Sequence, residues 1–315
     1  MLLTRFGQGN FYSNRLPYEK PSLLNVSWCE IVPSNCTYAL ATSLFPEQSL
    51  NWLKRKSPQL FNGRCKFLGI FDRCPKPDPY RDPTLTETDE NCFVLEGARK
   101  SGIVHCTLLL LRTNEFLRLV VGGTNLDGQI EVDRDSLYIQ DFPIVSKKQA
   151  SPCDFATRLK TFLNYIPYEG LQSGEEKIVK NFCNDVIEQV DFNGASGELI
   201  ACMPKNDHGG SGGYQDLRDA LQDMESLVGG RVDIATGHNG HLQFPFLLQM
   251  TNALRNITDV ETDEEINERF SEQQITNIGK TFLYHSSREA VLAGNPFAVL
   301  RTTAPSSKSH PEILE

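Results

Sequence analysis

Apolar residues in the first half of the chain recur at two spacings. Alternating or continuous apolar runs predict strands, which lie at Val26–Val32, Cys65–Phe71, Cys92–Leu95 and Ser136–Val145. Apolar residues three or four apart predict a helix over Pro46–Lys56 and another after Pro152, the latter with Phe155, Leu159, Phe162 and Ile166 on one face. Because strands and helices alternate along the sequence, we expect a layered α/β domain.

The second half shows the same alternation with weaker patterns. Ser173 and Glu176 form a capping-box pattern before an amphipathic helix over Glu175–Val190, whose apolar face is Ile178, Phe182, Val186 and Val190. Further strands are predicted over Gly197–Met203, Arg231–Thr236 and Thr281–His285, and helices over Tyr214–Leu227 and Leu242–Leu254. The proline-rich stretch Asp72–Asn91 is predicted to be an extended surface loop, and the tail after Arg301 a loop.

A boundary is expected near Pro167 to Gly174. It divides the chain into an N-terminal half, residues 1–168, and a C-terminal half, residues 169–315.

The clearest local pattern is a β-hairpin over Gly102–Leu126. With its turn at Thr113–Glu115, antiparallel pairing sets His105 opposite Gly122 or Gly123, and Asn125 follows just beyond. Thr107 is two residues after His105, so the two side chains share a face of the strand.

A histidine and an asparagine placed in this way favour phosphoryl transfer. The imidazole of His105 is a nucleophile able to attack phosphorus, while the amide of Asn125 is suited to hold the phosphate oxygens. The competing interpretation is structural. A single histidine in an apolar hairpin is often a core residue, and an asparagine after Gly-Gly-Thr suits a turn.

Charge and composition restrict the partners. The formal net charge is −9, from 31 basic and 40 acidic residues, and basic residues cluster only at Lys54–Lys56 and Lys147–Lys148. This balance argues against broad, non-specific binding of duplex DNA but permits a narrow cleft for the end of a strand.

The same composition points to an intracellular protein that binds no metal. The nine cysteines form no CxxC pair and the six histidines are not spaced as ligands, so we expect reduced, structural cysteines and no zinc. Apolar runs are too short for a membrane span, and the N-terminus has no signal-peptide pattern.

The segment VHCTLLLLRTNEFLRLVVGGTNL resembles the first active-site motif of the tyrosyl-DNA phosphodiesterases, a branch of the phospholipase D superfamily. That motif is His-x-Lys, two apolar strands and an asparagine, and the spacing from His105 to Asn125 fits it. The flanking segments SLFPEQSLNWLKRKSP, SLYIQDFPIV and DFATRLKTFLNYI follow in the order of the family. The resemblance covers Ser27 to Tyr168, and from Ser173 to Gly294 it rests on the order of elements.

The resemblance implies a phospholipase D-like α/β fold of two similar α-β-α layered halves packed side by side. It implies that His105 is the nucleophile, forming a phosphohistidine intermediate, and that Asn125 and the residue at position 107 bind the phosphate, with no metal or cofactor. The implied substrate is a DNA 3′ end, single-stranded, that carries a covalent adduct such as phosphotyrosyl. DNA repair in the nucleus is implied in the same way.

Two departures from the motif leave the activity open. Thr107 stands where the family has lysine, and the C-terminal half shows no second His-x-Lys, since His310 is followed two residues later by Glu312. The C-terminal half is thus either truncated, with its motif beyond Glu315, or lacks that motif. The function is then either phosphodiester hydrolysis or that of a catalytically inactive relative, a DNA-end-binding or protein-interaction scaffold. A third interpretation is an unrelated α/β protein.

Overall fold

The computed structural model describes residues 4–16, 18–23, 25–72, 84–97, 107–122, 125–127, 136–146, 153–165 and 171–200, and the strands over 231–236, 281–285 and 298–303. The chain divides into two compact units, Met1–Leu199 and Ile200–Glu315.

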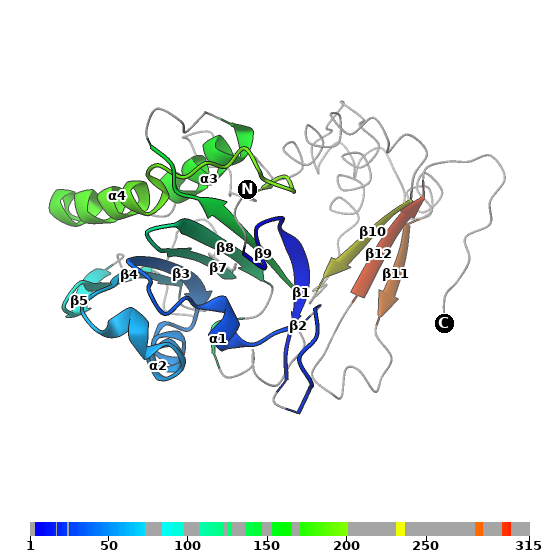
Figure 1. Cartoon of the computed structure of the whole chain (residues 1–315), viewed down its shortest axis with the longest axis horizontal. Coiled ribbons are helices and arrows are strands. Elements are labelled where there is room, and N and C mark those ends of the chain that lie inside the picture. The colour runs from blue at the N-terminus through cyan, green and yellow to red at the C-terminus, as the bar shows by residue number, and fades with distance from the viewer. Residues whose placement is uncertain are drawn as a thin grey trace, which may run out of the picture. The chain divides into compact units, whose positions relative to one another are not determined.

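The first unit is built on one nine-stranded sheet (Figure 1). Its strands, in spatial order, are β2 (Asn25–Val26), β1 (Asn10–Asn14), β9 (Ser136–Pro143), β8 (Phe116–Gly122), β7 (Thr107–Arg112), β3 (Tyr38–Leu44), β4 (Lys66–Asp72), β6 (Cys92–Gly97) and β5 (Thr84–Asp89). Strands β3, β4 and β6 run parallel, whereas β7, β8, β9 and β1 alternate in direction. The sheet is therefore mixed.

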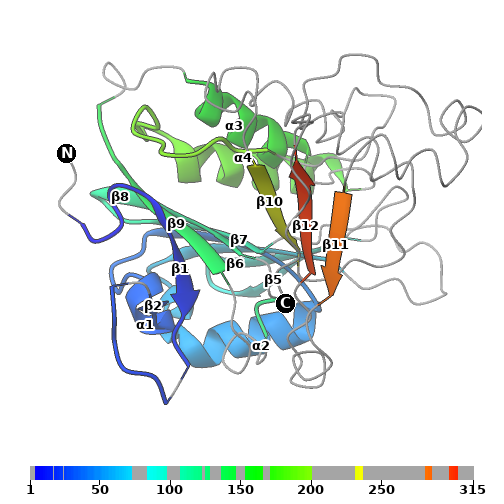
Figure 2. The same ribbon diagram turned by 90° about the vertical axis from the view of Figure 1, so that its right-hand side faces the viewer.

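Helices cover both faces of this sheet (Figures 1 and 2). One face carries α1 (Trp28–Ile31), α2 (Pro46–Lys56) and the 3-10 turn Pro58–Phe61, and the other carries α3 (Asp154–Tyr165) and α4 (Ser173–Ile187). The result is the three-layered α/β arrangement expected from the alternation of elements.

The run Leu108–Leu111 in β7 shows why a central strand is apolar throughout. Leu109 and Leu111 belong to the core beneath α2, and Leu108 and Leu110 to the core beneath α3 and α4. Because both faces are covered, both sets of alternating side chains are buried, and the run is continuous rather than alternating.

Several predicted elements are confirmed. Helix α2 has the predicted bounds, Pro46–Lys56, and the hairpin turn lies at Thr113–Glu115 between β7 and β8. Strands β4, β6 and β9 lie where the apolar runs placed them.

The predicted strand over Val26–Val32 is wrong. Only Asn25–Val26 is a strand, and α1 begins directly after Ser27. The Glu30 carboxylate accepts hydrogen bonds from the Ser27 backbone N–H and hydroxyl, at 2.9 and 2.6 Å. This capping box begins a helix within a segment whose apolar alternation is typical of a strand.

Three further expectations need correction. The capping box of α4 is formed by Gln172 and Glu175, one residue before the predicted pair Ser173 and Glu176. The buried face of α4 contains Val179, whereas Ile178, predicted to be on that face, is 42% exposed. The stretch predicted as a surface loop contains β5, whose side chains are mostly exposed because it is an edge strand. Finally, the described part of the predicted strand Gly197–Met203, residues 197–200, has no strand.

Helix α4, predicted to belong to the C-terminal half, packs on the sheet of the first unit through Phe182 and Val186. The second unit contains a three-stranded antiparallel sheet in the order β10 (Arg231–Thr236), β12 (Ala298–Thr303) and β11 (Thr281–His285). Strands β10 and β11 confirm their predictions, whereas β12 was not predicted. The predicted helices Tyr214–Leu227 and Leu242–Leu254 lie outside the described residues.

Three buried cysteines, Cys36, Cys65 and Cys92, line the start of β3, β4 and β6 within one apolar core. Burial raises the pKa of Cys36 to about 12 and raises the pKa values of Cys65 and Cys92 above the ordinary range. These thiols therefore act as small apolar residues and are poor nucleophiles.

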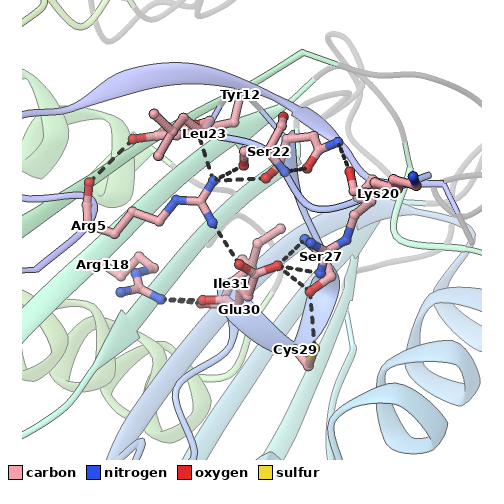
Figure 3. Close-up of polar contacts among 12 residues, drawn as sticks. Arg5, Tyr12, Lys20, Ser22, Leu23, Ser27, Cys29, Glu30, Ile31 and Arg118 are labelled. Carbon is pink, nitrogen blue, oxygen red and sulfur yellow. Dashed lines mark hydrogen bonds and ion pairs between the residues drawn. The ribbon is translucent and has the colours of Figure 1, made fainter.

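A buried ion pair between two strands of the sheet also binds helix α1. The Arg118 guanidinium in β8 donates two hydrogen bonds to the Asp141 carboxylate in β9, at 2.7 and 2.8 Å, and two more to the carbonyls of Glu30 and Ile31. The arginine and aspartate side chains are only 7% and 0% exposed. Figure 3 shows the guanidinium facing α1.

We predict that Arg118→Ala lowers the free energy of unfolding by about 3–5 kcal/mol, because the Asp141 carboxylate is left buried without its partner. Lys54→Ala, which breaks the exposed Lys54–Asp89 pair, is the matched control and should cost less than about 1 kcal/mol. Urea unfolding followed by circular dichroism measures both values. Equal losses in the two variants would contradict this account.

Candidate functional site

The residues predicted to bind phosphate lie toward one end of the large sheet, which we call the Thr107 end. Strand β7 begins there with Thr107, which pairs with Gly122 at the end of β8. Strands β3 and β4 run antiparallel to β7, so they end there, at Leu44 and Asp72.

The observed register differs from the predicted one. Gly122 lies opposite Thr107, not opposite His105, because the hairpin turn pairs Arg112 with Leu117 and fixes every later pair. His105, the candidate nucleophile, lies outside the described residues.

Thr107 is only 3% exposed. By strand alternation its side chain is on the same face as Leu109, toward the core beneath α2. A threonine fits this site without the cost of burying a charge, whereas a lysine would need a nearby anion or a route to solvent.

The backbone hydrogen-bond ladder between β3 and β7 is followed by a hydrogen bond to a side-chain hydroxyl. The last backbone pair is Ala41 with Leu109, and the Leu108 N–H then donates to Oγ1 of Thr42 at 3.0 Å. Thr42 is fully buried. Its side chain therefore replaces a backbone acceptor and fixes the start of β7, directly beside Thr107.

A second hydroxyl fixes the segment that contains Asn125. Oγ of Ser43 accepts the Leu126 N–H at 2.9 Å, and Oγ of Ser49, in α2, lies 3.2 Å from Oγ of Ser43. Ser43 and Leu126 are at most 1% exposed, and Asn125 is half-buried. Asn125 is thus anchored beside the end of β3 while its side chain keeps some contact with solvent.

Thr42, Ser43 and Ser49 were not among the predicted site residues. The available signal was the pair of hydroxyl residues that interrupts the apolar run at the end of YALATSL, since buried polar groups require partners.

At the Thr107 end, the described residues of β3, β4, β7 and the 125–127 segment include acidic but no basic side chains. Asp72 and Asp127 contribute carboxylates, and these segments contain no lysine or arginine on this end. These segments therefore offer no cationic side chain to a bound phosphate.

In the described part of the chain, His, Cys, Asp and Glu side chains form no group of three able to hold a metal ion. Among those same residues, no helix has the length and apolarity to cross a membrane.

Comparison with known proteins gives a structural match only. No family model matches the sequence, and neither does any curated protein. Solved structures of yeast tyrosyl-DNA phosphodiesterase do match. A variant in which a histidine is replaced by asparagine aligns with a TM-score of 0.54 and 13% identity, covering 82% of this chain and 62% of that one. A histidine-to-alanine variant gives 0.52 and 12%, covering 79% and 61%.

The chain therefore has the phospholipase D-like fold of the tyrosyl-DNA phosphodiesterases, as the resemblance implied. It spans about three fifths of the length of those two yeast structures. The organisation into two similar halves at 168/169, and the roles of His105, Thr107 and Asn125, stay predictions.

We predict that Ser43→Ala leaves the buried Leu126 N–H without an acceptor and destabilises the fold by about 1–3 kcal/mol. Hydrogen exchange at the Leu126 amide should accelerate, because the segment next to Asn125 loses its anchor. Thr157→Ala, which removes an exposed hydroxyl on α3, is the control and should change stability by less than about 0.5 kcal/mol. Unchanged exchange at Leu126 in Ser43→Ala would refute this role.

Proposed function

We propose that this protein is a phosphodiesterase that removes covalent adducts from DNA 3′ ends, with His105 as the nucleophile. One observation carries the proposal. In a fold shared with tyrosyl-DNA phosphodiesterases, hydroxyls of β3 accept the N–H groups of Leu108 and Leu126, the residues next to Thr107 and Asn125, at one end of the sheet. The proposed substrate implies a nuclear protein that acts in DNA repair.

The proposed reaction has two steps. A ring nitrogen of His105 attacks the 3′ phosphorus and forms a P–N bond, while the P–O bond to the adduct breaks and the leaving oxygen takes up a proton from a general acid. Water then attacks phosphorus and gives a proton to the conjugate base of that general acid, while the P–N bond breaks, a 3′-phosphate is released and the histidine is restored.

Asn125 is suited to stabilise both steps. Its amide N–H group would donate to a non-bridging phosphate oxygen, where negative charge grows in the transition state. The Ser43 to Leu126 hydrogen bond limits the motion of the adjoining backbone, so little reorganisation is needed when phosphate binds.

The second candidate function is that of a catalytically inactive scaffold that binds DNA ends or proteins. The burial and neutrality of Thr107 favour it, because the family motif has a lysine there. Removing one such electrostatic group typically lowers the rate about 10²–10³-fold.

We predict that the protein releases tyrosine from a single-stranded oligonucleotide with a 3′-phosphotyrosyl group, and that His105→Ala abolishes this release. His208→Ala is the matched control and should keep the wild-type rate, because His208 lies outside the proposed hairpin motif. Product is measured by chromatography, and trapped phosphohistidine by mass spectrometry after acid-free quenching.

The same assay separates the two candidate functions. Thr107→Lys should increase the rate if position 107 contacts the phosphate, provided that circular dichroism shows a folded variant. Retained oligonucleotide binding without turnover would favour the scaffold, whereas absence of both binding and turnover would reject the phosphodiesterase and the DNA-end-binding scaffold.

A further inference from the structure

Two strongly exposed apolar side chains lie on one loop of the first unit. Residues 15–16 and 18–23, which we call the Tyr18 loop, lie between β1 and β2 in the chain, and among them Tyr18 is 82% and Leu23 85% exposed. Large apolar side chains held in solvent on a surface loop are typical of a contact surface.

Hydrogen bonds hold the second part of this loop in place, after the buried side chain of Leu16. Nη2 of Arg5 donates to the carbonyls of Ser22, Leu23 and Asn25, at 3.0, 3.2 and 2.8 Å. The Asn25 side chain in turn donates to the Lys20 carbonyl at 3.0 Å. Figure 3 shows Arg5 beneath the loop, tied to Glu30 on α1. These bonds restrict the backbone at Lys20, Ser22 and Leu23, which lowers the entropic cost of binding a partner there.

The charged groups of the loop leave one cation available. Arg15 pairs with Glu30 at 2.6 Å, and the Glu19 carboxylate accepts the Leu16 N–H. The Lys20 ammonium has no ion pair within the described residues, and Lys20 is exposed. An aromatic ring and an available cation two residues apart are the combination that binds single-stranded nucleic acid, by stacking on a base and pairing with a phosphate.

The loop emerges from the same end of the sheet as the candidate site. Strand β1 ends at Asn14, and Ser13 lies opposite Ser136 at the start of β9, which in turn borders the end of β8. Between β1 and β7 lie β9 and β8, so three steps between strands separate the end of β1, where the loop begins, from Thr107 laterally, about 14 Å. A strand of a few nucleotides spans that distance.

We propose that the Tyr18 loop is a stacking platform for single-stranded DNA whose 3′ end lies at the Thr107 end. The ring of Tyr18 stacks on a base a few nucleotides from the 3′ end, and Lys20 contacts a phosphate. This inference rests on the proposed substrate but not on catalysis.

The test is binding of a fluorescent oligothymidine of about ten nucleotides with a 3′-phosphate, measured by anisotropy. Tyr18→Ala should weaken this binding about tenfold or more, whereas Tyr18→Phe, which keeps the ring, should bind like wild type. Lys20→Gln should reduce the salt dependence of binding by about one phosphate contact. Ile178→Ala, which removes an exposed apolar side chain on α4, is the matched control and should have no effect.

A second measurement, displacement of the fluorescent oligothymidine by thymidine 3′-phosphate, distinguishes failure of the stacking platform from failure of the proposed function. The mononucleotide is too short to reach the loop, so Tyr18→Ala should bind it as wild type does. Equal oligothymidine binding by Tyr18→Ala and wild type would overturn the platform alone and leave the loop as a protein-contact surface. Wild-type protein that binds neither ligand would overturn the proposed function together with the platform.

Discussion

The contact between Arg118 and Asp141 is the interaction on which the first unit depends most. Burying two charges is favourable only when their hydrogen-bonding groups are satisfied, and here the guanidinium also donates to two carbonyls of α1 and lies 4.3 Å from the Phe6 ring centre. The Asp141 carboxylate accepts a further hydrogen bond from Thr4 at 2.7 Å. One ion pair thus joins β8, β9, the N-terminal segment and α1. Through Glu30 on α1, it also supports Arg5 and the Tyr18 loop.

The polar side chains of the candidate site lie where the hydrogen-bond ladder between β3 and β7 ends. Along most of their length the central strands bury apolar side chains on both faces, which leaves no site for a polar ligand. At the Thr107 end the pairing of β3 with β7 ends, and Thr42 and Ser43 accept backbone N–H groups that a strand would otherwise bond. The same hydroxyls that satisfy these groups fix the position of the candidate ligand-binding segments.

The elements predicted correctly from the sequence are those whose formation depends on residues close together in the chain. Helix α2 has its own start and stop residues, and the hairpin turn is set by a few neighbouring residues, so both were found at their observed positions. Strand β3 was missed because its small and hydroxyl residues give a weak local pattern, and they are buried only once β4 and β7 flank the strand and helices cover both faces of the sheet. The partners of Thr42 and Ser43 lie 66 and 83 residues away, so no local signal could assign them. The burial of Thr107 likewise follows from the assembled sheet.

Threonine at position 107 has a consequence for the unliganded protein. A lysine in its place would extend from β7 toward the core beneath α2 and would be desolvated with no anion beside it, a cost that a neutral hydroxyl avoids. A neutral side chain at this position needs no anion to offset a buried charge. Burial of position 107 therefore favours a neutral side chain, whereas a bound phosphate favours a cation beside it. At this position the requirements of folding and of phosphate recognition differ.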